Sequence, residues 1–204
     1  MSSQTATKPK RPYRKRRRAE QEEKTRLRIT EAAVDLHGSV GPANTTISAV
    51  AERAGVQRAT VYRHFRDEEA LFDACSSHWA ARHPLPDLEE WQAIEDPEQR
   101  LTKAFEELYA WYTEAEPMLS RTTRDAPLVP AMRRPVARMG QWFEAAHEVL
   151  MRGRPERGAR RRLVGAAVSH AMAFHTWHSL VVEQGVPEPD AVELMAALVA
   201  AAAD

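Results

Sequence analysis

Several features are scarce in this sequence of 204 residues, and each absence excludes a class of protein. The single cysteine, Cys75, cannot form an intrachain disulfide, and we expect it to be a small buried residue rather than a redox sensor. No apolar run approaches the roughly 18 residues that a membrane-spanning helix needs, and the alanine-rich segment 194–203 is too short. Strand-like alternation and internal repeats are also missing. We therefore expect an all-α cytoplasmic protein without membrane contact.

Catalytic patterns are missing as well. The chain has no Ser-His-Asp, Cys-His or phosphate-binding signature, and the paired glutamates at 89–90 and 106–107 are typical of solvated charge. His175 and His178 share a helix face, but no acidic residue or cysteine stands beside them at metal-ligand spacing, and His170 points elsewhere. We expect no enzymatic activity, no cofactor and no metal site. The role of the three histidines stays open between interface and pocket rim.

Charge is distributed unevenly along the chain, although 29 basic and 29 acidic residues cancel overall. Residues 1–75 hold 15 Lys and Arg against 10 Asp and Glu, whereas residues 76–204 hold 14 against 19. Such asymmetry indicates one part that faces nucleic acid and another part with a different task.

The first 22 residues form a basic arm, in which eight Lys and Arg between positions 8 and 18 are uninterrupted by an acid. Its composition predicts disorder in isolation, and no apolar segment follows to make it a secretion signal. We expect its arginines to lie along DNA phosphates or in a minor groove; the alternative is a solubilising tail without defined contacts. The candidates are Arg14, Arg16, Arg17 and Arg18.

Residues 45–72 predict two short helices joined by a glycine turn. Thr45 or Thr46 is suited to cap the first helix, which should end at Gly55, where a positive φ favours glycine. The second helix is expected from about Gln57 to His64, and acidic residues at 67–69 suit the start of a third. The apolar positions expected to face inward are Ile47, Val50, Ala51, Ala54, Ala59, Tyr62 and Phe65. On this pattern alone, an ordinary helical hairpin with a solvated polar face is the alternative.

The segment from Arg28 to Ala74 resembles the DNA-binding domain of the tetracycline-repressor (TetR) family of bacterial transcription regulators. The matching residues keep unbroken spacing: Ile29, Ala32, Ala33, Leu36, Gly41, Thr46, Ile47, Val50, Ala51, Ala54-Gly55-Val56, Thr60-Val61-Tyr62, His64-Phe65 and Glu69-Ala70-Leu71. The resemblance covers about a quarter of the chain, and the remainder resembles the family only in being helical. Three positions depart from the usual residues: Gln57 replaces a capping Ser or Thr, Ala59 replaces Gly, and Glu68 replaces a Lys that approaches phosphate.

Polar residues of the second short helix are the candidates for contact with DNA. Arg58, Thr60 and Arg63 are expected to contact base edges, because arginine suits guanine in the major groove. Contacts with phosphates, or the orientation of neighbouring side chains, are expected from Thr46, Gln57, Tyr62 and His64. Arg66 is a candidate to replace the missing Lys.

We predict three parts of the chain: the basic arm at 1–22, a helix-turn-helix domain at 23–75, and a helical effector-binding and dimerisation domain at 76–204. Proline, glycine and charge clusters separate the apolar helix faces of the last part. Helices are expected at 67–82, 97–115, 117–124, 129–151 with a bend near Pro135, 156–183 and 189–203.

The resemblance further implies an effector pocket among the middle helices. Aromatic and Met side chains there suit a small apolar or aromatic effector, although such residues at helical spacing also form ordinary cores. The candidates are Phe105, Tyr109, Tyr112, Met139, Trp142, Phe143, Phe174 and Trp177.

The last two helices are expected to form a homodimer around a two-fold axis; the alternative is that they only close a monomer core. The expected stripes are Leu163, Ala166, Ala167, His170, Phe174, Trp177, His178 and Val181 on one helix, and Val192, Met195, Ala196 and Val199 on the other.

The hypothesis that joins these features is a sequence-specific DNA-binding transcriptional regulator of a bacterial cytoplasm, associated with the nucleoid. It would bind a palindromic operator in double-stranded DNA, and a small-molecule effector would release it by tilting the helix 67–82. Repression is the family default, although some members activate. Two alternatives are an architectural DNA-binding protein without an effector and an α-helical protein-interaction module.

Overall fold

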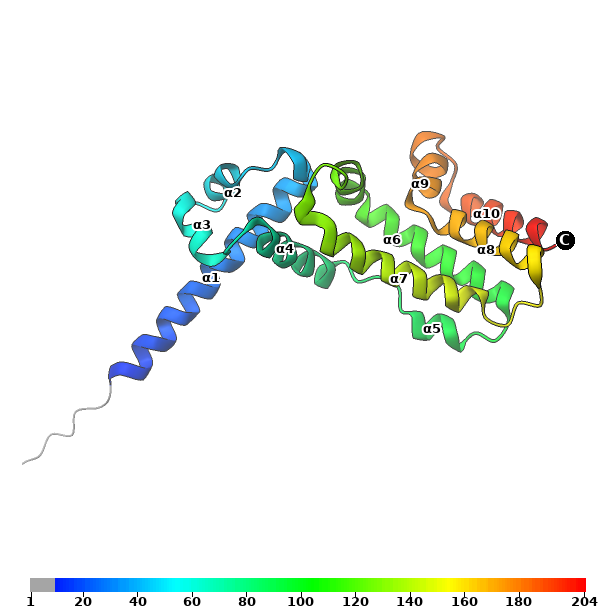
Figure 1. Ribbon diagram of the computed structural model, residues 1–204, viewed down its shortest axis with the longest axis horizontal. Helices are drawn as coiled ribbons and strands as arrows, with labels where there is room; N and C mark the ends of the chain where they lie inside the picture. Colours follow the sequence, from blue (N-terminus) through cyan, green and yellow to red (C-terminus); the bar gives the residue numbers. More distant parts are fainter. Residues whose placement is uncertain (1–9) are drawn as a thin grey trace, which may run out of the picture.

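The computed structural model describes residues 10–204, except for the side chains of residues 10–12 and 14. Within this range the regular structure is helical and no strand occurs, so the all-α prediction is confirmed. Figure 1 shows an elongated molecule, with a small group of helices at the amino-terminal end and a larger bundle that extends away from it. No described helix combines the length and the apolar character that crossing a bilayer would require.

The amino-terminal group consists of four helices: α1 (Lys10–Ser39), α2 (Ile47–Arg53), α3 (Arg58–His64) and α4 (Glu68–Arg82). A short 3-10 turn, η1 (Pro42–Asn44), connects α1 to α2. Apolar side chains from all four helices meet in one core: Ile29, Ala32, Ala33, Val50, Ala51, Ala54, Val61, Phe65, Leu71 and Cys75. Cys75 is 2% exposed, and burial raises the pKa of its thiol to about 12, so it is a packing residue.

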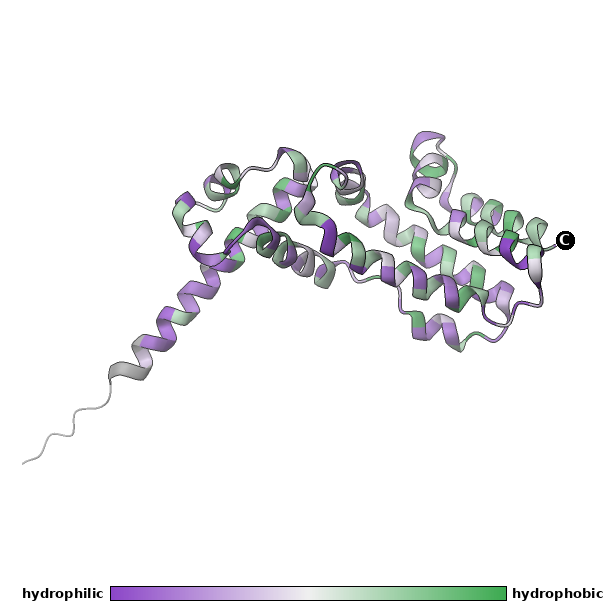
Figure 2. Cartoon of the chain, viewed as in Figure 1, coloured by the Kyte–Doolittle hydropathy of each residue, from purple (hydrophilic) through white to green (hydrophobic). Residues whose placement is uncertain are grey.

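The start of α1 differs from the expected disorder of residues 1–22. The helix begins at Lys10, and its amino-terminal half projects from the body as an almost entirely hydrophilic rod (Figures 1 and 2). Ion pairs four residues apart stabilise it, at 2.9 Å between Arg16 and Glu20 and at 3.0 Å between Arg18 and Glu22. The acids that follow the basic run therefore supply helix partners, which the composition of the first residues alone does not show. The part of that prediction that concerns residues 1–9 lies outside the described residues.

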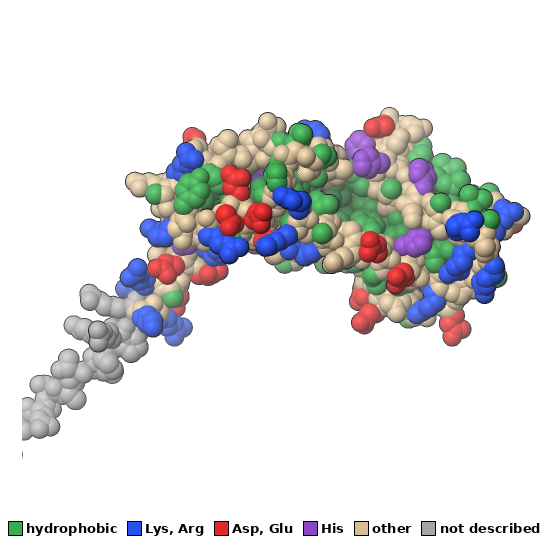
Figure 3. Space-filling view, in the orientation of Figure 1, with side chains coloured by type: hydrophobic (Ala, Val, Ile, Leu, Met, Phe, Trp, Pro, Cys, Tyr) green, Lys and Arg blue, Asp and Glu red, His purple; other side chains and the backbone are tan. Residues whose placement is uncertain are grey.

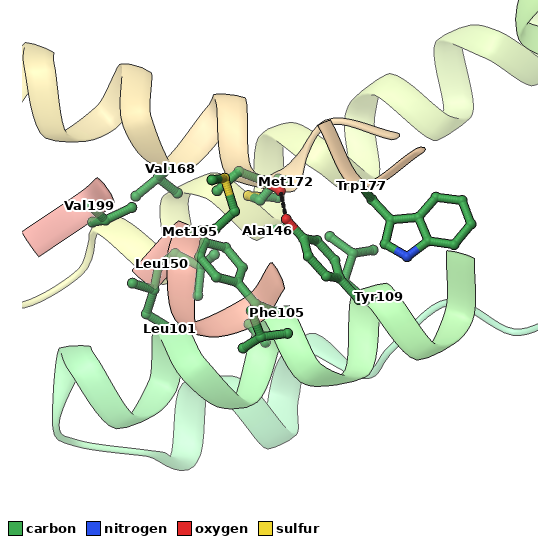
Figure 4. Packing of buried hydrophobic residues seen from close by; sticks show 14 of the residues in the cluster. Leu101, Phe105, Tyr109, Ala146, Leu150, Val168, Met172, Trp177, Met195 and Val199 are labelled. Carbon is green, nitrogen blue, oxygen red and sulfur yellow. Dashed lines mark hydrogen bonds between the residues drawn. The ribbon is translucent and has the colours of Figure 1, made fainter. Parts of the chain in front are cut away.

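The larger bundle contains α5 (Leu88–Ala93), α6 (Pro97–Asp125), α7 (Arg133–Met151), α8 (Gly158–Met172), α9 (Phe174–Trp177) and α10 (Glu188–Ala203). A 3-10 turn, η2 (Pro130–Met132), precedes α7, and a π-helical segment, η3 (His178–Glu183), follows α9. Figure 4 shows how Leu101, Phe105 and Tyr109 of α6 point toward residues of α8 and α10. The core is thus centred on α6, whose inner face is buried over most of its length.

Two predicted helix boundaries are wrong in this bundle. A break was expected near Pro117, but α6 continues through it, because Ala115 and Leu119 keep the inner face packed on both sides. The expected single helix 156–183 is instead interrupted at Ala173, whose backbone is extended with φ −70° and ψ 133°. The reason for this interruption lies in α6: the hydroxyl of Tyr109 donates to the carbonyl of Ala171 at 2.9 Å, and that of Tyr112 to Met172 at 2.6 Å. Buried carbonyls freed by the break are thereby satisfied.

Polar contacts on two sides join the amino-terminal group to the bundle. Asp125, at the end of α6, is 2% exposed and accepts the backbone N–H of Ala43 in η1 at 2.9 Å. A side chain at Gly41, which has φ 90°, would collide with Asp125 and its neighbour Arg124. On the other side, Arg134 and Arg138 of α7 pair with Asp73 of α4 at 3.3 and 3.2 Å. Both helices α6 and α7 are therefore connected directly to the amino-terminal group.

Candidate nucleic-acid interface and effector cavity

The helix-turn-helix begins with a capped α2. The hydroxyl of Thr46 accepts the N–H of Ala49 at 3.1 Å, as expected for an N-terminal cap. After α2, Gly55 adopts φ 63° and the N–H of Val56 donates to the carbonyl of Ala51 at 2.9 Å, which closes the helix end. Since Thr46 caps the helix through its hydroxyl, its side chain fixes the position of α2 relative to the turn.

Helix α3 is anchored by different residues from those expected. Val61 and Phe65, four residues apart, are 1% and 2% exposed, whereas Tyr62 is 46% exposed and Ala59 is exposed as well. The inward assignment of Ala59 and Tyr62 was therefore wrong, because a helix of only seven residues admits more than one apolar face and Val61 defines the buried one. As a consequence, Tyr62 joins the outward surface. This surface consists of the exposed Gln57, Arg58, Ala59, Tyr62 and Arg63, with Thr60 and His64 half-buried at its edge.

Internal contacts hold α3 in place and orient its outward side chains. Arg26 of α1 donates to the carbonyl of His64 at 2.7 Å, and its guanidinium lies 4.2 Å from the centre of the Phe65 ring. Arg58 donates to the hydroxyl of Tyr62 at 3.3 Å, one helical turn away. Burial, together with the charges of Arg63 and Arg26, lowers the pKa of His64, which favours its neutral form.

The remaining residues expected to contact DNA lie on either side of this surface. Arg16 and Arg18 are exposed on α1, and each is paired with a glutamate of its own helix; Arg17 lies 5.9 Å from the ring centre of Tyr13. Arg66 follows α3 and pairs with Asp67 at 2.9 Å. The side chain of Arg14 lies outside the described residues.

A cavity of about 320 Å³ lies in the bundle between α6, α7 and the interrupted end of α8. Four of the residues expected to bind an effector line it, namely Tyr112, Met139, Phe143 and Phe174. The other four do not: Phe105, Tyr109 and Trp177 are at most 1% exposed in the core, and Trp142 packs edge-on against Trp91 and Phe143. Phe105 and Tyr109 lie away from this cavity because α6 turns them toward α8 and α10.

Other residues complete the lining of this cavity and were not expected from the sequence. They are Trp111, Leu119, Thr123, His147, Ser169, Met172 and Ala173. Ser169, Met172 and Ala173 reach the cavity because α8 ends beside it. A search for polar residues one turn from the aromatic positions would have found His147, which lies four residues after Phe143.

The histidines of the α8–η3 region have separate surroundings. His178 lies 3.4 Å from Glu183 and 3.9 Å from Glu116, with its ring against Phe174. His170 and His175 are exposed. Among the residues described, no three His, Cys, Asp or Glu side chains are grouped so that they could hold a metal ion.

Together, the fold and these surfaces define an all-α protein with an amino-terminal helix-turn-helix and a helical bundle that encloses a cavity. A family model described as "Bacterial regulatory proteins, tetR family" matches residues 29–75. Residues 29–75 are therefore similar to the DNA-binding part of the TetR family of bacterial regulatory proteins.

Related sequences match less than half of this chain. The HTH-type transcriptional regulator SrpR of Pseudomonas putida is 33% identical over 87 residues, which are 39% of this chain and 40% of SrpR. The tetracycline repressor protein class A from transposon 1721 of Escherichia coli is 36% identical over 70 residues, or 32% of each chain. The matched segments thus span well under half of these curated relatives.

Solved structures share the fold over nearly the whole chain. NalD, the secondary repressor of the MexAB-OprM multidrug efflux pump in Pseudomonas aeruginosa, superposes with a TM-score of 0.63 over 90% of this chain and 97% of NalD, at 20% identity. A TetR-like transcriptional regulator from Rhodococcus sp. RHA1 gives a TM-score of 0.63 over 86% and 93%, at 18% identity. The bundle is therefore similar to these proteins in fold, with little similarity in sequence.

Proposed function

We propose that this protein is a sequence-specific DNA-binding transcriptional regulator, a homodimeric repressor that a small molecule releases from a palindromic operator. The observation that carries the proposal is the outward face of α3, where Arg58, Tyr62 and Arg63 are exposed on a helix anchored by Val61 and Phe65. A short helix of this kind fits the major groove, and arginine forms bidentate hydrogen bonds with guanine. The protein acts in the cytoplasm at the nucleoid and not as an enzyme. Its working parts are a basic arm at 1–22, a DNA-binding domain at 23–75 and an effector-binding domain at 76–204.

Selection of bound duplexes from a random pool tests DNA binding. Arg58→Ala and Arg63→Ala should each cost about 1–3 kcal/mol on the selected site and relax its sequence preference at specific positions. Arg160→Ala is a matched control, because Arg160 is exposed on α8, in the bundle and away from the helix-turn-helix. Unchanged sequence preference in both α3 variants would refute the assignment of base contacts.

The exposed basic residues at the start of α1 support a second, sequence-tolerant contact with phosphates. Arg16, Arg17 and Arg18 carry charge along a helix that projects from the DNA-binding end. Their replacement by Ala should weaken binding to all duplexes alike and reduce the dependence of affinity on salt by roughly one unit of slope per lost phosphate contact. Arg66 is an additional candidate for a phosphate contact beyond the end of α3.

Exposed apolar side chains on α8 and α10 support the homodimer. Leu163 is 53% exposed, and Leu194 and Leu198 are 49% and 40% exposed on the adjacent helix. Leu163 belongs to the expected stripe, but the face of α10 differs from the expected one, because Val192, Met195 and Val199 point into the protein's own core. Two copies of this helix pair would form a four-helix interface. Sedimentation of Leu163→Asp combined with Leu198→Asp should give a monomer; a dimer of unchanged stability would contradict this arrangement.

The cavity supports an effector of apolar or aromatic character, bound by Tyr112, Met139, Phe143 and Phe174. Its volume of about 320 Å³ lies at the small end of the range for ligand pockets. Binding there would act on α6 and α7, which contact the amino-terminal group through Asp125 and through the pairs of Arg134 and Arg138 with Asp73. An architectural protein without an effector would show no ligand that changes operator affinity, so a ligand screen against the selected duplex separates the two functions.

A further inference from the structure

A second hollow adjoins the effector cavity. It has a volume of about 930 Å³ and lies between α5, α7 and the first part of α8. His147 and Ser169 line both spaces, so the two spaces are neighbours along the groove between α7 and α8. The groove therefore has one end beside the aromatic residues of α6 and α7 and another end beside the turn that joins α7 to α8.

The two ends of this groove differ in chemistry. The effector end is lined by the rings of Trp111, Tyr112, Phe143 and Phe174. The second end is basic, because Arg152, Arg161 and Arg162 line it against one acid, Glu148. Figure 3 shows the same contrast on the surface: Lys and Arg side chains gather at the end of the bundle that is far from the helix-turn-helix, while hydrophobic side chains fill the hollow nearer the middle.

One of these arginines is available to a ligand. Arg161 donates to the carbonyl of Met151 at 3.1 Å, and Arg152 donates to that of Gln92, so both are held by the protein itself. Buried Arg154 pairs with Glu98 at 2.9 Å and does not line the hollow. Arg162 is exposed, and it forms no hydrogen bond or ion pair with any residue between 10 and 204 that the structure describes. Its guanidinium is therefore an unpaired donor at the edge of the hollow.

At the junction between the two ends, the imidazole of His147 packs closely against Gly165 of α8. The Nε2 atom of His147 lies 3.2 Å from the carbonyl oxygen of Gly165, and a Cβ atom at position 165 would come within 3.3 Å of the same nitrogen. Gly165 thus leaves room for the imidazole between α7 and α8. Ten residues of α8 separate Arg162 from Met172, a distance of about 15 Å along the helix axis.

We propose that the effector is an elongated amphipathic anion. Its apolar part occupies the aromatic cavity, and its carboxylate, phosphate or sulfonate group reaches past His147 and Ser169 to Arg162. This inference deepens the proposed function and rests on the aromatic cavity being the effector site. A charged head group at one end explains why an apolar groove ends in a basic cluster, because a buried apolar ligand alone would need no cation there.

Two elongated fluorescent probes that differ only in the charge of the head group test the proposal: 12-(1-pyrenyl)dodecanoate and its neutral methyl ester. Titration of the unaltered protein should show tighter binding of the carboxylate. Arg162→Glu should weaken binding of the carboxylate about tenfold and leave binding of the neutral probe unchanged. Arg160→Glu is the matched control, because it makes the same charge change two residues away on α8, outside the hollow. Phe143→Ala should weaken both probes.

Equal losses for both probes in Arg162→Glu, or equal losses in Arg162→Glu and Arg160→Glu, would overturn the head-group assignment. The head-group assignment would also be overturned if dodecanoate displaced the neutral probe no better than dodecanol does. Binding to the selected duplex without probe is measured for the unaltered protein and every variant. Intact DNA binding with no preference for the anion refutes this inference alone, whereas an unaltered protein that selects no duplex refutes the proposed function.

Discussion

The two cores of this protein are built from different side chains. The amino-terminal core contains Ala, Val, Ile, Leu, Cys and a single aromatic residue, Phe65. The bundle core instead contains Trp91, Trp111, Trp177 and a row of aromatic residues on α6. Small side chains let short helices approach closely, whereas large rings hold helices further apart.

This difference agrees with the extent of the matches to known proteins. The family model covers residues 29–75 and the curated relatives match 32–39% of the chain, whereas the bundle is similar to solved structures at low identity. A helix that must enter a DNA groove constrains the spacing of its neighbours. A cavity has to suit one ligand, so different side chains on the same helices serve different members of a fold family.

The largest expected effect tests whether the two cores are independent. Phe65→Ala should destabilise the amino-terminal group by about 3–5 kcal/mol, because it removes a buried ring. All five Trp residues lie after residue 75, so Trp fluorescence reports on α4 and the bundle, while far-ultraviolet circular dichroism reports on every helix. Trp79 of α4 packs against the bundle core and Trp111, so the fluorescence reports mainly on the bundle. In urea, part of the dichroism signal should be lost before the main change in fluorescence. If both signals move together, the protein unfolds as one unit and the comparison fails.

One pH dependence of stability should arise in the amino-terminal group, beside its core. His37 stacks on Phe72 with ring centres 4.5 Å apart, and burial lowers its pKa from 6.5 to about 4. Between these values the unfolded chain binds the proton and the folded chain does not, so stability falls as pH decreases from about 6.5 to about 4, by up to about 3 kcal/mol. His37→Gln should remove this part of the dependence. Unfolding curves with the same pH slope for both proteins would show that His37 is not the cause.

Tyr112→Phe should act on the bundle only. It leaves the ring in place but removes the donor to the carbonyl of Met172, at an expected cost of about 1–3 kcal/mol for an unsatisfied buried acceptor. The transition followed by Trp fluorescence should shift to lower urea concentration, while affinity for the selected duplex stays constant. A loss of DNA affinity at a temperature where the variant is folded would mean that the end of α8 already influences α3.

One substitution should change stability least and yet strongly reduce the coupling between effector binding and DNA release. Asp73→Asn weakens the ion pairs with Arg134 and Arg138, which are partly exposed, so it should cost less than about 1 kcal/mol. The release of DNA by a bound effector should nevertheless weaken, because α7 loses its charged contact with α4. Asp35→Asn is the control, since Asp35 forms an exposed pair with Arg53 inside the amino-terminal group. Equal release by both variants would exclude this route.

The sequence was most informative where structure depends on near neighbours. Thr46 and Gly55 determine the ends of α2 locally, so the helix-turn-helix could be predicted. The end of α8 could not, because it depends on hydroxyls of Tyr109 and Tyr112, more than 50 residues earlier. The same two residues show why the candidate cavity was only partly predicted: an aromatic residue at helical spacing is compatible with a cavity wall, a core and a helix cap. The orientation of α3 was ambiguous, since both Tyr62 and Val61 complete an apolar pattern.

The length of α1 has a mechanical consequence. The helix has 30 residues and is therefore about 45 Å long, and only its carboxyl-terminal part is embedded among the other helices. A rotation of about 5° at the embedded end would sweep the charged tip through roughly 4 Å, about the rise of three residues. A slight reorientation of the helix near Ser39 would therefore shift the exposed Arg16, Arg17 and Arg18 by a distance comparable to the size of a phosphate group.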